Sequence, residues 1–156
     1  MHQQQIYVIT AAATVIIGLL VLGFFVREGI VTSNIYKQGV KLYQEKDYKG
    51  AEATFRLVIS RHPSNDVVRL LLGDCLMQQE KLEDATAVFQ ELSDRAPKNV
   101  DARLRLGMAL VKQDKLNEAV SVLETAKDLL LAQRNTEKAE SVEQVLQQIR
   151  TQQSLT

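Results

Sequence analysis

The feature that most constrains the fold of this chain is an internal repeat with a period of 34 residues. Four kinds of residue return at this interval: glycine, alanine, a bulky apolar residue and proline. They stand at Gly39, Gly73 and Gly107; at Ala51, Ala85 and Ala119; at Phe55, Phe89 and Leu123; and at Pro63 and Pro97. Agreement of separate kinds of residue on one period indicates that each repeat is one supersecondary unit that stacks on its neighbours.

Each unit contains two apolar stripes at helical spacing, with a polar turn between them. In the second unit, Leu70, Gly73 and Met77 belong to the first stripe, and Ala85 and Phe89 belong to the second. Spacings of three and four residues bring such side chains to one face of a helix. The chain has only two Pro and seven Gly in 156 residues, which also favours helix. We therefore predict helical hairpins in an all-α fold.

The recurring glycines are unfavourable inside a helix, so their presence at these positions needs an explanation. A glycine inside a helix costs about 1 kcal/mol relative to Ala, so its recurrence indicates that another element crosses very closely. We expect the recurring alanines to lie opposite the glycines. We expect Phe55 and Phe89 to fill the space between one hairpin and the next, and Pro63 and Pro97 to end the second helices.

This set of residues resembles the tetratricopeptide repeat family, whose pattern has a small residue early in the first helix, Ala and an aromatic in the second, and Pro at the end. The resemblance covers residues 32–133 and implies a curved solenoid of three repeats. Their expected bounds are residues 32–65, 66–99 and 100–133.

Two features depart from the family pattern. The bulky aromatic near the start of the first helix is replaced by Ile35, Arg69 and Arg103. Leu131 stands where the third Pro is expected, so we predict that the last second helix extends from about residue 117 to about residue 133.

A further amphipathic helix is predicted over residues 134–150. Ala139, Val142, Leu146 and Ile149 share one face of it. Terminal repeats of a solenoid need a polar outer face, so we interpret this helix as a C-terminal cap and residues 151–156 as a frayed tail.

The N-terminal segment, residues 1–26, contains no Asp, Glu, Lys or Arg, and residues 6–26 form a nearly uninterrupted apolar run. A helix of 21 residues spans about 30 Å, the thickness of a bilayer core. A cleaved signal peptide is the alternative, but this run is too long and lacks both a basic flank and a cleavage motif of small residues. We therefore predict a single transmembrane anchor, followed by a linker at residues 27–31.

The charges that flank the anchor predict its orientation. Arg27, Lys37, Lys41 and Lys46 follow the apolar run, and no basic residue precedes it. Positive charge is enriched on the cytoplasmic side of membrane proteins. We expect a single-pass protein whose repeats lie on the cytoplasmic or stromal side.

The sequence lacks the signatures of catalysis and of metal or cofactor binding. Nineteen Lys and Arg balance nineteen Asp and Glu without a basic cluster, which argues against nucleic acid as a partner. His2 precedes the anchor, His62 lies in a turn beside Pro63, and Cys75 falls on a packing face. Motifs for zinc, nucleotide or disulfide chemistry are not found in the sequence. We expect a protein that is not an enzyme and uses no cofactor.

A binding surface is implied by the resemblance, because the first helix of each hairpin lines the concave face of tetratricopeptide proteins. By the glycine register, thirteen residues should lie there, and eight of them are apolar or aromatic. They are Tyr36, Val40, Tyr43 and Gln44 from the first repeat; Leu70, Asp74, Met77 and Gln78 from the second; and Asp101, Leu104, Met108, Val111 and Lys112 from the third.

An apolar concave face suits an amphipathic helix or a hydrophobic peptide of a partner protein. The alternative is that the cap helix, a second copy of the chain or the linker covers it, and self-association is left open. Family members that clamp an acidic chaperone C-terminus use Asn and Lys here. This chain instead has Val40, Asp74 and Met108, and Asp74 should repel a carboxylate.

Two functions follow from this layout. The first is a membrane-anchored scaffold that binds a subunit or an assembly factor and assists assembly of a membrane complex; the second is a permanent accessory subunit of such a complex. An N-terminal anchor followed by three repeats resembles the photosystem I assembly proteins of cyanobacteria and plastids, which implies a thylakoid membrane. Anchored quality-control adaptors outside photosynthesis share the layout.

Overall fold

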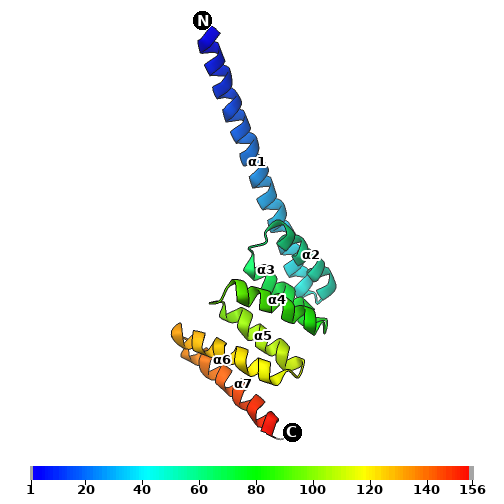
Figure 1. Cartoon of the computed structure of the whole chain (residues 1–156). Coiled ribbons are helices and arrows are strands. Elements are labelled where there is room, and N and C mark those ends of the chain that lie inside the picture. Colours follow the sequence, from blue (N-terminus) through cyan, green and yellow to red (C-terminus); the bar gives the residue numbers. More distant parts are fainter. Residues whose placement is uncertain (1, 155–156) are drawn as a thin grey trace.

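The computed structural model of the chain describes the backbone of residues 2–154 and the side chains of Tyr7 and of residues 13–154. Seven α-helices make up the described part of the chain (Figure 1). They are α1 (His2–Gln44), α2 (Tyr48–Arg61), α3 (Asp66–Gln78), α4 (Leu82–Arg95), α5 (Val100–Lys112), α6 (Leu116–Ala132) and α7 (Thr136–Ser154). The predicted all-α class is confirmed.

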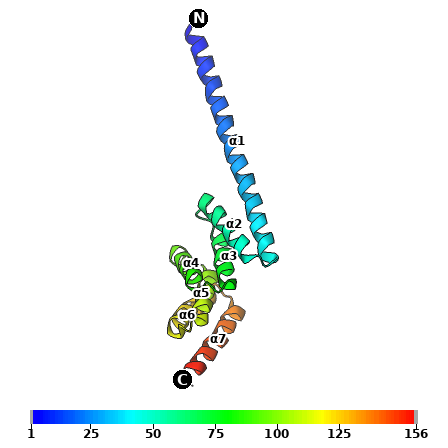
Figure 2. The same cartoon turned by 90° about the vertical axis from the view of Figure 1, so that its right-hand side faces the viewer.

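The helices form a stack in which each one packs against the next along the chain. The pairs α1–α2, α3–α4 and α5–α6 are antiparallel hairpins, and α7 packs against α6 at the far end. The first half of α1 projects from this stack, so the two ends of the chain lie at opposite ends of the molecule (Figure 1). In the turned view, α4 and α6 lie on one side of the stack and α1 and α7 on the other (Figure 2).

The repeated glycines are explained by large side chains on the neighbouring helix. A β-carbon built on Gly73 would lie 2.2 Å from Cε1 of Phe89, and one on Gly39 would lie 2.7 Å from Cε1 of Phe55. In the third hairpin, a β-carbon on Gly107 would meet Cδ2 of Leu123 at 2.5 Å. The nearest neighbours of the absent glycine side chains are therefore a ring or a leucine of the same hairpin, and the recurring alanines are not among them.

The turns between helices repeat as regularly as the helices do. The side-chain oxygens of Asn65, Asn99 and Asn135 accept hydrogen bonds from the backbone N–H three residues on, at 3.1, 3.0 and 3.2 Å. Such N-caps satisfy donors that the first turn of a helix leaves unpaired. These caps begin α3, α5 and α7.

Residues 27–31, expected to be a linker, are helical and belong to α1. The reason is local: this segment has one glycine, Gly29, and no proline. One glycine costs about 1 kcal/mol, and packing of the second half of α1 against α2 offsets that cost. An ion pair of 3.1 Å between Glu28 and Arg61 ties the same segment to the end of α2.

The C-terminal helices differ slightly from the expected bounds. Helix α6 has 17 residues where α2 and α4 have 14, consistent with the absence of a proline at Leu131. Helix α7 continues to Ser154 and includes most of the segment expected to fray. Gln153 donates to Asn117 of α6 at 2.8 Å and so holds this last turn. Met1 of the anchor and residues 155–156 of the tail lie outside the described residues.

The projecting part of α1 has the length and composition of a membrane span. From Ala13 onward the helix contains a window with a mean hydropathy of 2.1 that is not buried by any other part of the described chain. A signal sequence has the same length and composition, but here the apolar helix continues without a break into the first hairpin.

Candidate protein-binding groove

A hollow of about 400 Å³ opens between the first helices of successive hairpins. Nine residues line it, and seven of them are among the thirteen expected on the concave face. The lining residues are Tyr43, Asp74, Met77, Gln78, Phe89, Leu104, Arg105, Met108 and Lys112. We call this hollow the groove.

The repeat itself brings the apolar lining together. Tyr43 and Met77 both lie four residues after the repeated glycine, on α1 and α3, so they project from equivalent places on neighbouring helices. Met108, directly after Gly107 on α5, is 46% exposed. Methionine is flexible and polarisable and adapts to ligands of imperfect shape. The groove therefore has an apolar surface that can change shape.

A charged pair crosses the groove from α3 to α5. Nε of Arg105 lies 2.9 Å from Oδ1 and 3.1 Å from Oδ2 of Asp74. Because this guanidinium neutralises the carboxylate, Asp74 does not present the unpaired negative charge that we expected to repel a carboxylate terminus. Arg105 was missed by sequence reasoning. It lies two residues before Gly107, on the side of α5 that faces Asp74, and the opposite charges of the two positions were the available signal.

Tyr43 brings an aromatic ring and a hydroxyl to the residues that line the groove. Its ring lies edge-on to that of Tyr48, with centroids 5.5 Å apart, which fixes the ring orientation. Burial and, to a smaller extent, the Asp74 carboxylate raise the pKa of Tyr43. The hydroxyl therefore keeps its proton at neutral pH and can donate to a bound chain.

Several of the expected concave residues do not line the groove. Four of them are half-buried and pack against the hydrophobic core of the stack; they are Tyr36, Val40, Leu70 and Val111. Tyr36, for example, packs on Phe55 with ring centroids 6.5 Å apart. Gln44 and Asp101 are exposed at helix ends outside the groove. The binding role of all thirteen stays a prediction.

The other candidates for chemistry lie outside the groove or within the core. Cys75 is fully buried, and burial, followed by the Asp74 carboxylate, raises its pKa to about 12. Its thiol is therefore protonated and poorly nucleophilic at neutral pH. Among the described residues, no group of three His, Cys, Asp or Glu is arranged to hold a metal ion. His62 is exposed in the turn after α2, and the side chain of His2 lies outside the described residues.

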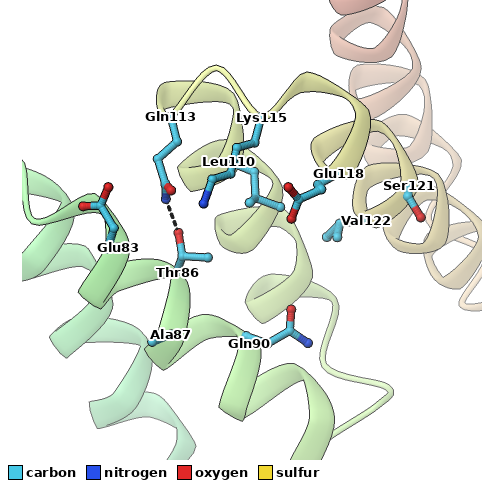
Figure 3. A pocket seen from close by; sticks show the side chains of 10 residues that line it. All are labelled: Glu83, Thr86, Ala87, Gln90, Leu110, Gln113, Lys115, Glu118, Ser121 and Val122. Carbon is cyan, nitrogen blue, oxygen red and sulfur yellow. Dashed lines mark hydrogen bonds between the residues drawn. The ribbon is translucent and has the colours of Figure 1, made fainter.

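A second hollow, of about 510 Å³, opens on the side of the second helices, between α4 and α6 (Figure 3). Polar and charged side chains occupy much of its rim, including Glu83, Gln90, Lys115 and Glu118. Gln113 closes one end by donating to Thr86 Oγ1 and, at 3.1 Å, to the carbonyl of Leu82.

The Gln113 contacts repeat one unit earlier and so belong to the stacking of the repeats. Gln79, 34 residues before Gln113, donates to the carbonyl of Tyr48 at 3.3 Å and to Oε2 of Glu52 at 2.7 Å. Glu52 is buried and also pairs with Arg56 and, at 2.9 Å, with Lys81. These side chains join successive hairpins, so the second hollow is a gap between structural contacts. The groove is the stronger candidate site.

Comparisons with known proteins agree with this geometry. A family model described as Tetratricopeptide repeat matches residues 42–98 and 76–129, which together cover more than half of the chain. No curated protein sequence matches the chain.

Several solved structures have the same fold at low sequence identity. The TPR2B domain of yeast Sti1, solved as a complex with pHsp70, is 17% identical and has a TM-score of 0.71, with coverage of 78% of this chain and 97% of that one. The type III secretion chaperone SycD of Yersinia enterocolitica, in complex with a peptide of the translocator YopD, is 20% identical, with a TM-score of 0.71 and coverage of 78% and 93%. The TPR domain of Arabidopsis OM64 is 19% identical, with a TM-score of 0.64 and coverage of 75% and 94%.

Proposed function

Because this chain belongs to the tetratricopeptide repeat family, whose members are non-enzymatic protein-interaction scaffolds, we propose that it is a membrane-anchored scaffold that holds a protein partner in the groove. The partner segment is an amphipathic helix or a hydrophobic peptide. The photosystem I setting and the thylakoid location stay predictions from the resemblance in layout, as do the roles of permanent accessory subunit and quality-control adaptor.

The observation that carries this proposal is the chemistry of the groove. Tyr43, Met77, Leu104 and Met108 supply an apolar surface, and the only acidic side chain that lines this hollow, Asp74, is neutralised by Arg105. An apolar segment buried there leaves no carboxylate unpaired, which would otherwise be costly. The structures of the Sti1 domain with pHsp70 and of SycD with a YopD peptide support a protein chain as the kind of ligand.

The anchor explains why the partner should belong to a membrane complex. The apolar half of α1 is long enough to cross a bilayer, so the groove stays near the membrane in which subunits are inserted and assembled. Four basic residues follow the apolar run within about twenty residues and none precedes it, which supports the cytoplasmic or stromal side. Protease added to sealed vesicles whose cytoplasmic or stromal face is on the inside should then spare the repeats, and complete digestion would reverse this orientation.

The test is a double substitution, Met77→Glu with Met108→Glu, in the full-length chain in its native membrane. Carboxylates buried against an apolar ligand without partners should weaken partner recovery by at least about tenfold, which corresponds to about 1.4 kcal/mol. Recovery is measured by crosslinking followed by mass spectrometry. The matched control is Ala87→Glu with Ser121→Glu, which adds the same two charges at exposed positions of the second hollow.

Loss of partners in the methionine variant alone, with an unchanged melting temperature, supports the groove. Equal recovery by both variants would contradict it. Unfolding of the methionine variant would favour coverage of the groove by the chain itself. The stoichiometry of the crosslinked partner separates two of the roles, since a permanent subunit stays in the finished complex and an assembly scaffold is absent from it.

A further inference from the structure

The continuity of α1 determines where the rest of the molecule lies relative to the membrane. Helix α2 runs antiparallel to α1, and three contacts set the alignment: Tyr43 with Tyr48, Gly39 with Phe55, and Glu28 with Arg61. From the first of these contacts to the last, the residue of α1 moves toward the apolar run while the residue of α2 moves toward the end of α2. The end of α2 and the turn that follows it, residues 62–65, therefore lie beside residues 26–29 of α1. We call residues 62–67 the α2–α3 edge.

The height of this edge follows from helix geometry. The apolar run ends at Val26, and Glu28 lies two residues farther, which is about 3 Å along the helix axis. The polar headgroup layer adds about 5–7 Å to each side of a bilayer core. An edge that is level with Glu28 therefore falls within the headgroup layer when α1 spans the membrane. In both views the turn between α2 and α3 lies nearer the projecting half of α1 than the turn between α6 and α7 does (Figures 1 and 2).

Hydrogen bonds hold the α2–α3 edge at this level. Asn65 caps α3 by accepting from the N–H of Val68 at 3.1 Å. The carbonyl of Pro63 accepts from Arg69 at 2.5 Å and from Arg95 at 2.7 Å, and Arg95 also pairs with Asp66. Side chains from α3 and from the end of α4 therefore fix the turn against the repeats, and the ion pair between Arg61 and Glu28 joins the end of α2 to α1.

The side chains at this level suit a membrane interface. Val67 and Ile30 are each 58% exposed, a large fraction for apolar residues of a folded stack. Arg27, three residues before Ile30, and His62, in the turn before α3, are exposed as well. Apolar side chains next to cationic or dipolar ones match a layer in which acyl chains meet phosphate groups.

We propose that the α2–α3 edge is a second membrane contact, which lies in the phospholipid headgroup layer of the leaflet where α1 leaves the bilayer. The side chain of Val67 reaches toward the acyl boundary, and Arg27 lies within reach of lipid phosphates. This inference rests on the anchoring of the chain by α1, which is part of the proposed function. It goes beyond the proposed function because the repeats then contact the membrane through their own surface, in addition to α1.

The test uses the full chain reconstituted in phosphatidylcholine vesicles that contain lipids with a nitroxide on the headgroup or, in a parallel sample that reports on position 20, on the acyl chain. A fluorophore is attached to Val67→Cys; Cys75 is left in place because its buried, protonated thiol does not compete for the label. Separate chains carry the label at Leu20→Cys, inside the apolar run, or at Gln148→Cys, an exposed position on α7. Nitroxide quenching at position 67 should exceed that at position 148 several-fold.

A matched variant has seven alanines inserted between Val26 and Arg27. Seven residues lengthen α1 by about 10.5 Å and leave every contact of the repeats intact, so quenching at position 67 should fall to that at position 148. Strong lipid quenching at position 20 without quenching at position 67 would overturn this inference and leave the anchor standing. Absence of lipid quenching at position 20 would overturn both. Quenching at position 67 that the insertion does not reduce would also contradict the geometry.

Discussion

At the scale of single residues, each of the three repeats contains the same pair of a glycine and a large apolar residue that fills the space beside it. Gly39, Gly73 and Gly107 give up a side chain, and a large side chain sixteen residues later occupies the space. The rings of Phe55 and Phe89 are completely buried in this position. The pair should therefore behave as one unit in mutagenesis.

The first prediction concerns Gly73 and Phe89. Gly73→Ala should destabilise the fold by about 1–3 kcal/mol despite the better helix propensity of Ala, because the new methyl overlaps the ring. Phe89→Ala should cost about 3–5 kcal/mol, because it leaves a cavity. The double variant should cost less than the sum of the two, since the methyl then enters that cavity. Urea unfolding of the detergent-solubilised chain measures all three; strict additivity would mean that the two residues do not share the space.

The second prediction concerns Cys75. Since its pKa is raised to about 12 and its side chain is buried, iodoacetamide at pH 8 should leave it unmodified for as long as the chain stays folded. Mass spectrometry after a timed reaction measures the modification, and the same reaction in 8 M urea serves as the control. Rapid alkylation of the folded chain would show that α3 opens locally.

The sequence predicted the positions of residues that follow the 34-residue repeat. It predicted less well which residues of two neighbouring helices contact each other. The recurrence of 34 residues located Phe89 and Tyr43, because their positions follow from helical spacing alone. The ring beside Gly73 was not predicted, since spacing within a helix does not say which residue of the next helix lies opposite. Arg105 was missed for the same reason: an ion pair between helices depends on their relative rotation.

At the scale of helices and turns, the repeat carries a strained residue at the end of each of its first helices. Lys46, Glu80 and Asp114 have φ values of 62°, 58° and 59°, in the left-handed region. Hydrogen bonds across the turn enforce this conformation: the N–H of Lys81 donates to the carbonyl of Leu76 at 3.0 Å, bridging the helix end.

The third prediction follows from this strain. A residue other than glycine costs about 1–2 kcal/mol in this conformation, and glycine loses about 0.5–1 kcal/mol more chain entropy on folding. Glu80→Gly should therefore stabilise the fold by up to about 1 kcal/mol. Ala53→Gly, on the exposed face of α2, should cost about 1 kcal/mol and is the control. Melting curves compare the two; a loss of stability with Glu80→Gly would mean that its side chain contributes more than the strain costs.

The fourth prediction concerns the attachment of α7 to α6. Nζ of Lys127 lies 2.9 Å from Glu143, and this hydrogen bond holds the pKa of Glu143 below its ordinary 4.5. A carboxyl with a lowered pKa contributes stability above its ordinary pKa and loses it as the pH falls through the lowered value. Glu143→Gln should therefore lower the melting temperature at pH 7. The difference from the unsubstituted chain should shrink as the pH falls below 4.5.

The lysine of this pair, Lys127, makes the stability depend on pH at the alkaline end of the range. The hydrogen bond to Glu143 raises the pKa of Lys127 above 10.5, so its contribution is complete below pH 10.5 and is lost as the pH rises through the raised value. Melting temperatures from pH 3 to pH 11 test both limbs. A difference between the two chains that stays constant with pH would show that this pair does not contribute to the docking of α7.

Helices were easier to predict than their junctions. The six repeat helices and the cap follow from amphipathic spacing, and the longer α6 follows from Leu131 in the place of a proline. The linker expected at residues 27–31 was the main error. A membrane span and a repeat have different compositions, which suggests a boundary, but helix continuity depends on the local absence of breakers and not on composition.

At the scale of the whole molecule, one unbroken helix joins the apolar half of α1 to the groove. Helix α1 is 43 residues long, which is about 65 Å, and its last turns carry Tyr43 in the groove. The prediction of an anchored solenoid could be made from sequence. The direction in which the groove faces could not, because it depends on the helical connection.

The fifth prediction uses this connection. Each alanine added between Val26 and Arg27 should turn the repeats by about 100° around the axis of α1 and raise them by about 1.5 Å. Two added residues turn the groove by about 200°, so that it faces away from a partner fixed in the same membrane, whereas seven turn it through nearly two full rotations. Crosslinking to that partner should be lost with two added residues and return in part with seven. A yield that falls steadily with insert length would indicate a flexible connection.

The unbroken helix has a consequence for the membrane itself. In a chain with a flexible linker, the groove could take any orientation around the axis of its anchor. A partner in the same bilayer could then reach the groove through rotation of the repeats alone. Here one unbroken helix sets the direction of the groove, so in the membrane-anchored state that we propose, the whole molecule has to rotate in the bilayer before a neighbour can dock. In that state, rotation of the anchor helix and rotation of the groove are the same motion. Any membrane protein that binds the apolar half of α1 would therefore also determine which neighbours the groove can face.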